Sequence, residues 1–188
     1  MLPPPQIRWI EHAEDPARNG VIDLYCAVFA EAPYFEKHDL QDVERHTWCR
    51  FAQHGLVVAE HHDRVVGFAC AIPLTAHPDR TIPTFVAAQP DFSAEPSRTV
   101  YMAELGVSPA ARGLGLGARL VDARLAWAHE RGLRWFVMRT DPDQSLSARI
   151  YQRRGGTPLA NLQDLGMVAG SNSRYRRFWW GPTQRPGT

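Results

Sequence analysis

The sequence lacks several features that would place it in a specialised class of protein. No apolar run approaches the roughly 18 residues that span a bilayer, and the N-terminus, MLPPPQIRWIEH, has no basic segment followed by an apolar one. Its 21 basic and 20 acidic residues leave a net charge of +1, so no strong global field attracts nucleic acid or anionic membranes. We therefore expect a cytoplasmic protein that binds neither membrane nor nucleic acid.

Cysteine is scarce, which bears on disulfides and on metal sites. The three cysteines, Cys26, Cys49 and Cys70, are odd in number and stand in apolar stretches, which favours buried free thiols. A zinc site brings together Cys or His pairs from two segments, and the adjacent His61 and His62 do not form such a pair. We therefore predict no metal.

The length and composition are those of one ordinary domain. With 188 residues, of which 44% are hydrophobic, the chain can bury about two thirds of its unfolded surface around a single core. We expect one domain over residues 1–188, with residues 1–5 and 182–188 as mobile ends.

Hydrophobic periodicity and turn residues predict alternating strands and helices. Strands are expected at 6–10, in a hairpin at 55–73, at 99–107, at 134–139 and twice within 161–180. Helices are expected at 15–29, at 40–53, after the loop 108–117 as far as about 131, and at 143–154. The stretch 74–98 carries Pro78, Pro83, Pro90 and Pro96 and no sustained period, so we predict a long connection that forms a lid or rim over a binding site.

The segment most informative about chemistry is Ser108-Pro-Ala-Ala-Arg-Gly-Leu-Gly-Leu-Gly117, between a strand and a helix. Glycines remove the Cβ atoms that would hold a phosphate away, and the first turn of a helix supplies free N–H donors. Arg112 adds a charged donor, which together predicts an anion site. The alternative is a glycine-rich turn that only lets the helix and strand pack closely.

Two other phosphate motifs fit less well. A P-loop requires Lys after its last glycine, which is missing here. A dinucleotide-binding loop requires G-x-G-x-x-G, whereas the spacing in this chain is G-x-G-x-G, with Ala118 as the only small residue that could replace the third glycine. An oxidoreductase therefore stays open as a weaker alternative.

Three motifs in order resemble the GNAT N-acetyltransferase superfamily. Residues 112–117 are similar to its R/Q-x-x-G-x-G/A loop, residues 104–109 to its fourth strand, and residues 144–155 to its N-x-x-A-x-x-L-Y-x-x-x-G helix. The resemblance implies an α/β (α+β) fold: a single GNAT-like domain with a mixed, mostly antiparallel sheet of six to seven strands flanked by about four helices.

The resemblance also implies acetyl-CoA as cosubstrate and a set of residues that bind it. These are Leu105, Gly106, Val107, Arg112, Gly113, Leu114, Gly115, Leu116, Gly117, Ala118 and Gln144. The loop residues would hold the pyrophosphate. A backbone N–H between Leu105 and Val107 would donate to the carbonyl oxygen of the thioester as it becomes anionic.

Acetyl transfer to an amine also needs a base and an acid. Glu104 is the nearest carboxylate that could take the ammonium proton, although a glutamate on an outward strand face is the alternative interpretation. Tyr151 occupies the tyrosine position of the family, from which a phenol can protonate the departing thiolate; a buried core tyrosine is the alternative.

Two positions depart from the family pattern. Gln144 stands where Asn is common, and Gly156 stands where an aromatic residue usually follows the last glycine.

The acceptor site is predicted from the break between the first two helices. Glu31, Tyr34, Phe35 and Glu36 combine aromatic rings with carboxylates, which suits a small amine. The leading hypothesis is an enzyme that moves an acetyl group from acetyl-CoA to a primary amine by direct attack in a ternary complex. A coenzyme A-binding sensor or docking module without turnover, and a protein or peptide amine acetyltransferase, remain alternatives, as does assembly as a homodimer.

Overall fold

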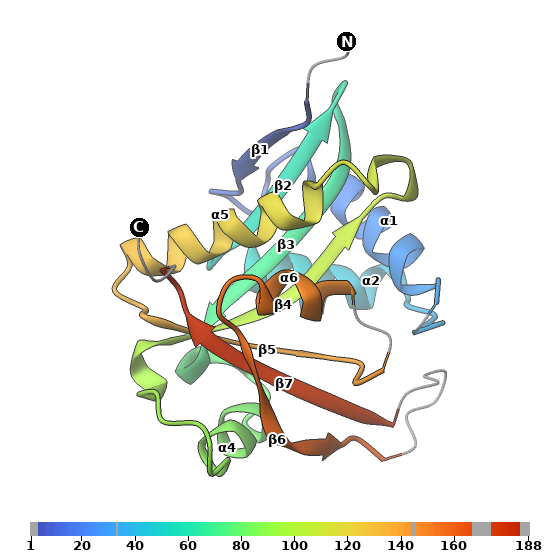
Figure 1. The fold of residues 1–188 in the computed structure, drawn as a ribbon. Helices are drawn as coiled ribbons and strands as arrows, with labels where there is room; N and C mark the ends of the chain where they lie inside the picture. Colours follow the sequence, from blue (N-terminus) through green and yellow to red (C-terminus); the bar gives the residue numbers. More distant parts are fainter. Residues whose placement is uncertain (1–3, 33, 144–145, 167–173, 185–188) are drawn as a thin grey trace. The chain divides into compact units, whose positions relative to one another are not determined.

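The computed structural model describes residues 4–32, 34–143, 146–166 and 174–184 (Figure 1). The chain divides into two compact units. The first unit contains Met1–Ala71 and Glu104–Arg124, and the second contains Ile72–Ala103 and Leu125–Thr188. Strands β3 and β4 and helix α5 each pass from one unit into the other, so the sheet can be followed through both.

The first unit is built on an antiparallel meander of β1 (Gln6–Trp9), β2 (Leu56–His61) and β3 (Arg64–Pro73). Trp9 lies opposite Val57, and Val57 opposite Ala69. The β2–β3 turn places His62 and Asp63 at φ values of 50° and 57°, which is the left-handed geometry that tight hairpins require. The hairpin predicted at 55–73 is confirmed.

Helix α1 (Arg18–Phe29) covers one face of this meander and buries Val21, Ile22, Leu24 and Tyr25. A second helical stretch follows as α2 (Leu40–Val43), a π-helical turn η1 (Glu44–Trp48) and α3 (Cys49–Phe51). The Asp39 side chain caps it by accepting from two backbone N–H groups, and the Trp48 indole donates to the Ala13 carbonyl at 2.8 Å. The predicted helix at 40–53 is therefore confirmed, with a π-turn that periodicity did not indicate.

The second unit contains the first part of β4 (Thr99–Val107), then β5 (Trp135–Thr140), β7 (Tyr175–Pro182) and β6 (Thr157–Asp164). Strand β4 pairs with β5 in parallel, whereas β5 with β7 and β7 with β6 are antiparallel. The strand order of the sheet is β1-β2-β3-β4-β5-β7-β6. The predicted α/β class with a mixed, mostly antiparallel sheet is confirmed (Figure 1).

Parallel pairing between β4 and β5 is observed within the second unit. It runs from Thr99 opposite Trp135 to Met102 opposite Met138.

The stretch 74–98 is more ordered than predicted. It contains two short 3-10 turns and helix α4 (Thr81–Ala87), whose Ile82 and Val86 are buried. The Asp91 carboxylate accepts from the Ala160 N–H at 3.0 Å, and the Phe85 ring lies 5.2 Å from that of Phe178. The prediction of an irregular connection was wrong, because apolar side chains at positions 82, 85 and 86 form one helical face that packs on β6 and β7.

Candidate functional site

The glycine-rich loop follows β4 within the first unit. A 3-10 turn, η4 (Pro109–Ala111), leads into it, and helix α5 (Leu116–Glu130) begins directly after it. Gly113 and Gly115 have φ values of 78° and 73°, which L side chains rarely adopt. A Cβ atom at either position would meet nothing within 4 Å, so the loop surface around both glycines is open.

This loop presents a series of backbone donors. Within the part of the chain that the structure describes, five consecutive N–H groups have no protein acceptor: those of Gly113, Leu114, Gly115, Leu116 and Gly117. At this end of the helix the Arg119 N–H donates to the Gly115 carbonyl at 3.1 Å. Free N–H groups at the start of a 15-residue helix form a cradle for an anion, and a pyrophosphate fits that chemistry.

Arg112 stands at the entrance to this cradle and is held by two oxygen atoms. Its Nε donates to the Val107 carbonyl at 3.1 Å, and its Nη1 lies 2.7 Å from Oε2 of Glu31. Both side chains remain accessible, with exposed fractions of 46% for Arg112 and 41% for Glu31. The guanidinium therefore lies at the loop and keeps donors available for an incoming anion.

The last residues of β4 alternate between two faces. Leu105 and Val107 pack against a cluster that includes Leu116 and Leu120 of α5. Gly106 faces the other way, because a Cβ there would lie 2.4 Å from the Phe68 ring and 3.0 Å from Val28 of α1. Successive side chains of a strand point to opposite faces, so Glu104 shares the α1 face with Gly106.

Electrostatics agree with this placement of Glu104. Burial and then the negative charge of Glu104 raise the pKa of the Tyr25 hydroxyl, with a smaller contribution from Glu36. Burial and the same carboxylate raise the pKa of the Cys70 thiol. Glu104 therefore lies within electrostatic reach of Tyr25 on α1 and of Cys70 on β3.

Sequence reasoning missed Arg124, which supports this part of β4. The side chain is only 1% exposed, and its Nη1 donates to the Cys70 carbonyl at 2.7 Å and to the Glu104 carbonyl at 3.4 Å. It therefore ties β3 to β4 beside Glu104. The sequence pattern that could have indicated this role is the position of Arg124 among Val121, Leu125 and Ala128 on an apolar helix, because an arginine buried in such a stripe needs acceptors.

The predicted acceptor residues lie in the turn between α1 and α2, also in the first unit. The Glu31 carbonyl accepts from the Tyr34 N–H at 3.2 Å and from the Phe35 N–H at 3.0 Å. Phe35 has a φ of 52°, a left-handed backbone conformation that is uncommon for a bulky residue and that occurs often in functional loops. Its side chain is 51% exposed. The structure brings Glu31, but not Glu36, to Arg112; Glu36 instead lies 3.0 Å from Nε2 of His38.

Tyr151 belongs to α6 (Leu146–Gln152) in the second unit. It is 1% exposed, and its ring lies 5.0 Å from that of Phe136. A Cβ at Gly156 would come within 2.9 Å of the Tyr151 carbonyl and 3.1 Å of Phe136, which explains the glycine where the family usually has an aromatic. Gln144, predicted to bind the coenzyme, lies outside the described residues.

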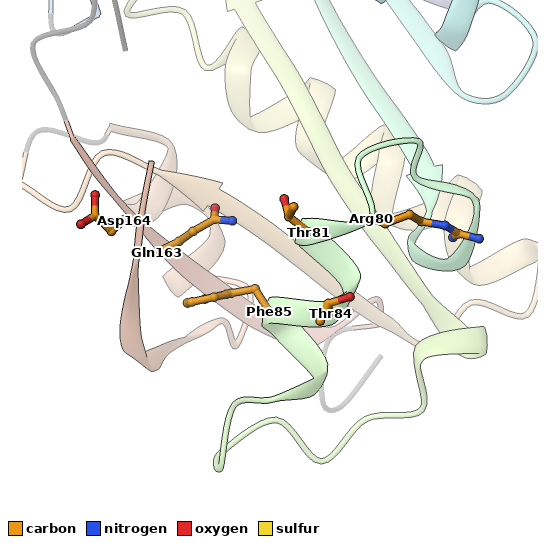
Figure 2. Close-up of a pocket in the computed structure, with 6 residues that line it drawn as sticks. All are labelled: Arg80, Thr81, Thr84, Phe85, Gln163 and Asp164. Carbon is orange, nitrogen blue, oxygen red and sulfur yellow. The ribbon is translucent and has the colours of Figure 1, made fainter. Parts of the chain in front are cut away.

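A separate hollow of about 530 Å³ lies within the second unit, between α4 and β6 (Figure 2). Thr81, Thr84 and Phe85 line it from α4, Arg80 from the position just before α4, and Gln163 and Asp164 from β6. Arg80 points away from the β6 residues in Figure 2, and Gln163 and Asp164 already bind Arg139 and Arg174. Because the polar side chains from β6 are already paired, we do not assign this hollow as a substrate site.

The described residues hold no cluster of three metal-ligating side chains and no helix long and apolar enough to cross a bilayer.

Comparisons with known proteins agree with the geometry of the loop. A sequence model described as "Acetyltransferase (GNAT) family" matches residues 20–156. Mycothiol acetyltransferase of Amycolatopsis mediterranei is 31% identical over 119 residues, which is 63% of this chain and 35% of that protein. Mycothiol acetyltransferase of Thermobispora bispora is 31% identical over 155 residues, or 81% of this chain and 46% of its own length. The chain thus spans less than half of these relatives.

Solved structures share the fold at low sequence identity. The Salmonella typhimurium acetyltransferase yncA, solved with its cofactor acetyl-CoA, gives a TM-score of 0.69 at 17% identity and covers 98% of this chain and 96% of its own. Ribosomal-protein-alanine N-acetyltransferase of Brucella melitensis gives 0.66 at 19% identity, covering 94% and 99%. The family match covers well over half of the chain and includes the glycine loop and β4. The chain belongs to the GNAT acetyltransferase family.

Proposed function

We propose that this protein is an acetyl-CoA-dependent N-acetyltransferase that acetylates a primary amine of a small molecule by direct attack in a ternary complex. The observation that carries the proposal is the row of five unengaged backbone N–H groups beside Arg112 at the start of α5. This arrangement supports binding of the pyrophosphate of coenzyme A. Membership of the family supports acetyl-CoA as the donor.

The first chemical step is attack of the neutral amine on the thioester carbonyl. Glu104 lies on the same face of β4 as Gly106, towards α1, and it would accept the ammonium proton directly or through a water. A backbone N–H between Leu105 and Val107 would stabilise the oxyanion, as the family resemblance implies. The role of Glu104 is thus supported by the face it occupies.

The second step is departure of the coenzyme thiolate, which must gain a proton. Tyr151 would donate it from its hydroxyl, as the resemblance implies. A phenol carries a proton near neutral pH and can donate it.

A small amine acceptor is supported by the segment that follows α1. Glu31 and Glu36 supply negative charge for an ammonium, and the exposed Phe35 and the Tyr34 ring supply apolar contact. The names of the relatives, mycothiol acetyltransferases, point to a small-molecule acceptor, whereas one structural neighbour acts on ribosomal-protein alanine. A protein amine therefore remains the second acceptor class, and a coenzyme-binding sensor is the alternative without turnover.

The test is release of free coenzyme thiol from acetyl-CoA in the presence of a panel of small amines and of peptides with free N-termini. Thiol release without acceptor is subtracted. Turnover with small amines supports the proposal. Turnover with peptides alone would show that the acceptor is a protein or peptide amine instead. Coenzyme binding without any turnover over the whole panel would favour the sensor.

A further inference from the structure

One ion pair joins two segments that sequence reasoning assigned to different substrates. Arg112 belongs to the coenzyme loop, whereas Glu31 belongs to the predicted acceptor segment between α1 and α2. Their side chains nevertheless meet at 2.7 Å, between Nη1 and Oε2. Both residues lie in the first unit, so the contact belongs to one compact body.

The contact places Glu31 in competition with a phosphate. A carboxylate and a phosphate oxygen are both anionic acceptors for a guanidinium, and the fork of Arg112 can satisfy either. Nε of Arg112 is already engaged by the Val107 carbonyl, which fixes the guanidinium at the loop. A pyrophosphate arriving at the N–H groups of residues 113–117 would therefore meet an arginine that already holds a carboxylate.

We propose that Glu31 is a built-in competitor for the pyrophosphate of coenzyme A. In the coenzyme-free protein its carboxylate occupies Arg112, and coenzyme binding displaces it. The released carboxylate then becomes available to the ammonium group of the acceptor. The proposal rests on the proposed function, since it assumes that coenzyme A binds at the glycine loop.

The structure favours an exchange of this kind over a permanent structural pair. Both side chains are more than 40% exposed, and exposed pairs of this type contribute little, equivalent to about 1.4- to 5-fold in an equilibrium constant. The main chain of Glu31 stays anchored without its carboxylate, because its carbonyl accepts from the N–H groups of Tyr34 and Phe35. The side chain can therefore change partner while the turn keeps its shape.

Displacement couples the two substrate sites. If coenzyme binding frees Glu31 for the acceptor, an acceptor that engages Glu31 must favour coenzyme binding by the same factor. The expected pattern is that each substrate lowers the apparent Kd of the other by the same factor. The size of the coupling is bounded by the modest strength of the pair.

The experiment is isothermal titration calorimetry with coenzyme A at 0.15 M salt. The proteins are the wild type, Glu31→Gln, Arg112→Ala, the double variant and the control Asp42→Asn. Asp42 carries the same charge on nearby α2 but pairs with Arg45. Glu31→Gln should tighten coenzyme A binding about two- to fivefold, this gain should shrink in the Arg112→Ala background, and Asp42→Asn should bind like the wild type.

The outcomes separate this inference from the proposed function. A wild type that does not bind coenzyme A overturns the proposed function and the inference with it. Normal wild-type binding with no gain in Glu31→Gln overturns the inference alone, as does a gain that persists undiminished without Arg112, since simple charge repulsion would then explain it. In the thiol-release assay, Glu31→Gln should lower KM for acetyl-CoA and raise KM for the amine, and an unchanged amine KM would refute the acceptor role.

Discussion

Gly106 offers a sharp test of how β4 is held in place. In Gly106→Ala the new Cβ would lie 2.4 Å from Cε1 and 2.8 Å from Cζ of Phe68, and 3.0 Å from Cγ2 of Val28. Ordinary contact begins near 3.4 Å, so the ring would have to move by about 1 Å. Phe68 is fully buried, and its ring stacks on that of Tyr25 at 5.8 Å, so no free space is at hand.

Overpacking of this kind costs about 1 to 3 kcal/mol, which for a chain of this length corresponds to a fall in melting temperature of roughly 2 to 12 °C. Thermal unfolding followed by circular dichroism measures it. Gly67→Ala is the matched control, because the two atoms nearest to its Cβ would be terminal methyl groups of Leu120 and Leu116, at 3.1 and 3.3 Å, which can yield, and the Gly106 carbonyl oxygen lies at an ordinary 3.4 Å. Phe68→Leu should partly rescue Gly106→Ala. A Gly106→Ala protein as stable as the wild type would refute the reasoning.

Three further predictions concern the acid, the base and one surface pair. Tyr151→Phe keeps the ring beside Phe136 but removes the hydroxyl, so kcat should fall about 10²- to 10⁴-fold with unchanged acetyl-CoA affinity; a normal kcat would remove the acid role. Glu104→Gln should lower kcat/KM near neutral pH and recover partly at high pH, where more amine is already neutral, and a defect that does not vary with pH would point to another base. The hydrogen bonds from Arg174 and from the Gly166 N–H lower the pKa of Asp164 to about 2. Since this pKa is depressed, the stabilisation is present above the unfolded value of about 3.9 and is lost as the pH falls through 2; an NMR titration of Asp164 should show its midpoint rise in Arg174→Ala.

The order of elements could be predicted because their signals are local. Alternation and turn residues identified the β2–β3 hairpin, and β4 was predicted at 99–107 with the bounds that the structure has. The loop at 112–117 was also predictable, since glycines at positive φ leave a mark in the sequence. Helix α4 could not be predicted, because a proline usually indicates a break, whereas Pro83 lies within the first turn of α4, where proline is tolerated.

The contacts between segments could not be predicted in the same way. Neither the pairing of Glu31 with Arg112 nor the bonds from Arg124 to two strand carbonyls can be derived from spacing along the chain. Each contact joins residues far apart in the chain and depends on tertiary packing, in which a shift of one residue in the register of β4 would exchange its two faces. Tertiary packing at Gly106 fixes that register through Phe68 and Val28.

The central claim is that the loop at 112–117 binds the pyrophosphate of coenzyme A, and calorimetric titration of acetyl-CoA tests it most directly. Arg112→Ala should weaken binding by about 1.5 to 3 kcal/mol, or roughly 10- to 150-fold, because it removes a charged donor. Gly115→Val should weaken it further, since its side chain would fill the open surface and strain a residue whose φ is 73°. Wild-type affinity in both folded variants would contradict the account.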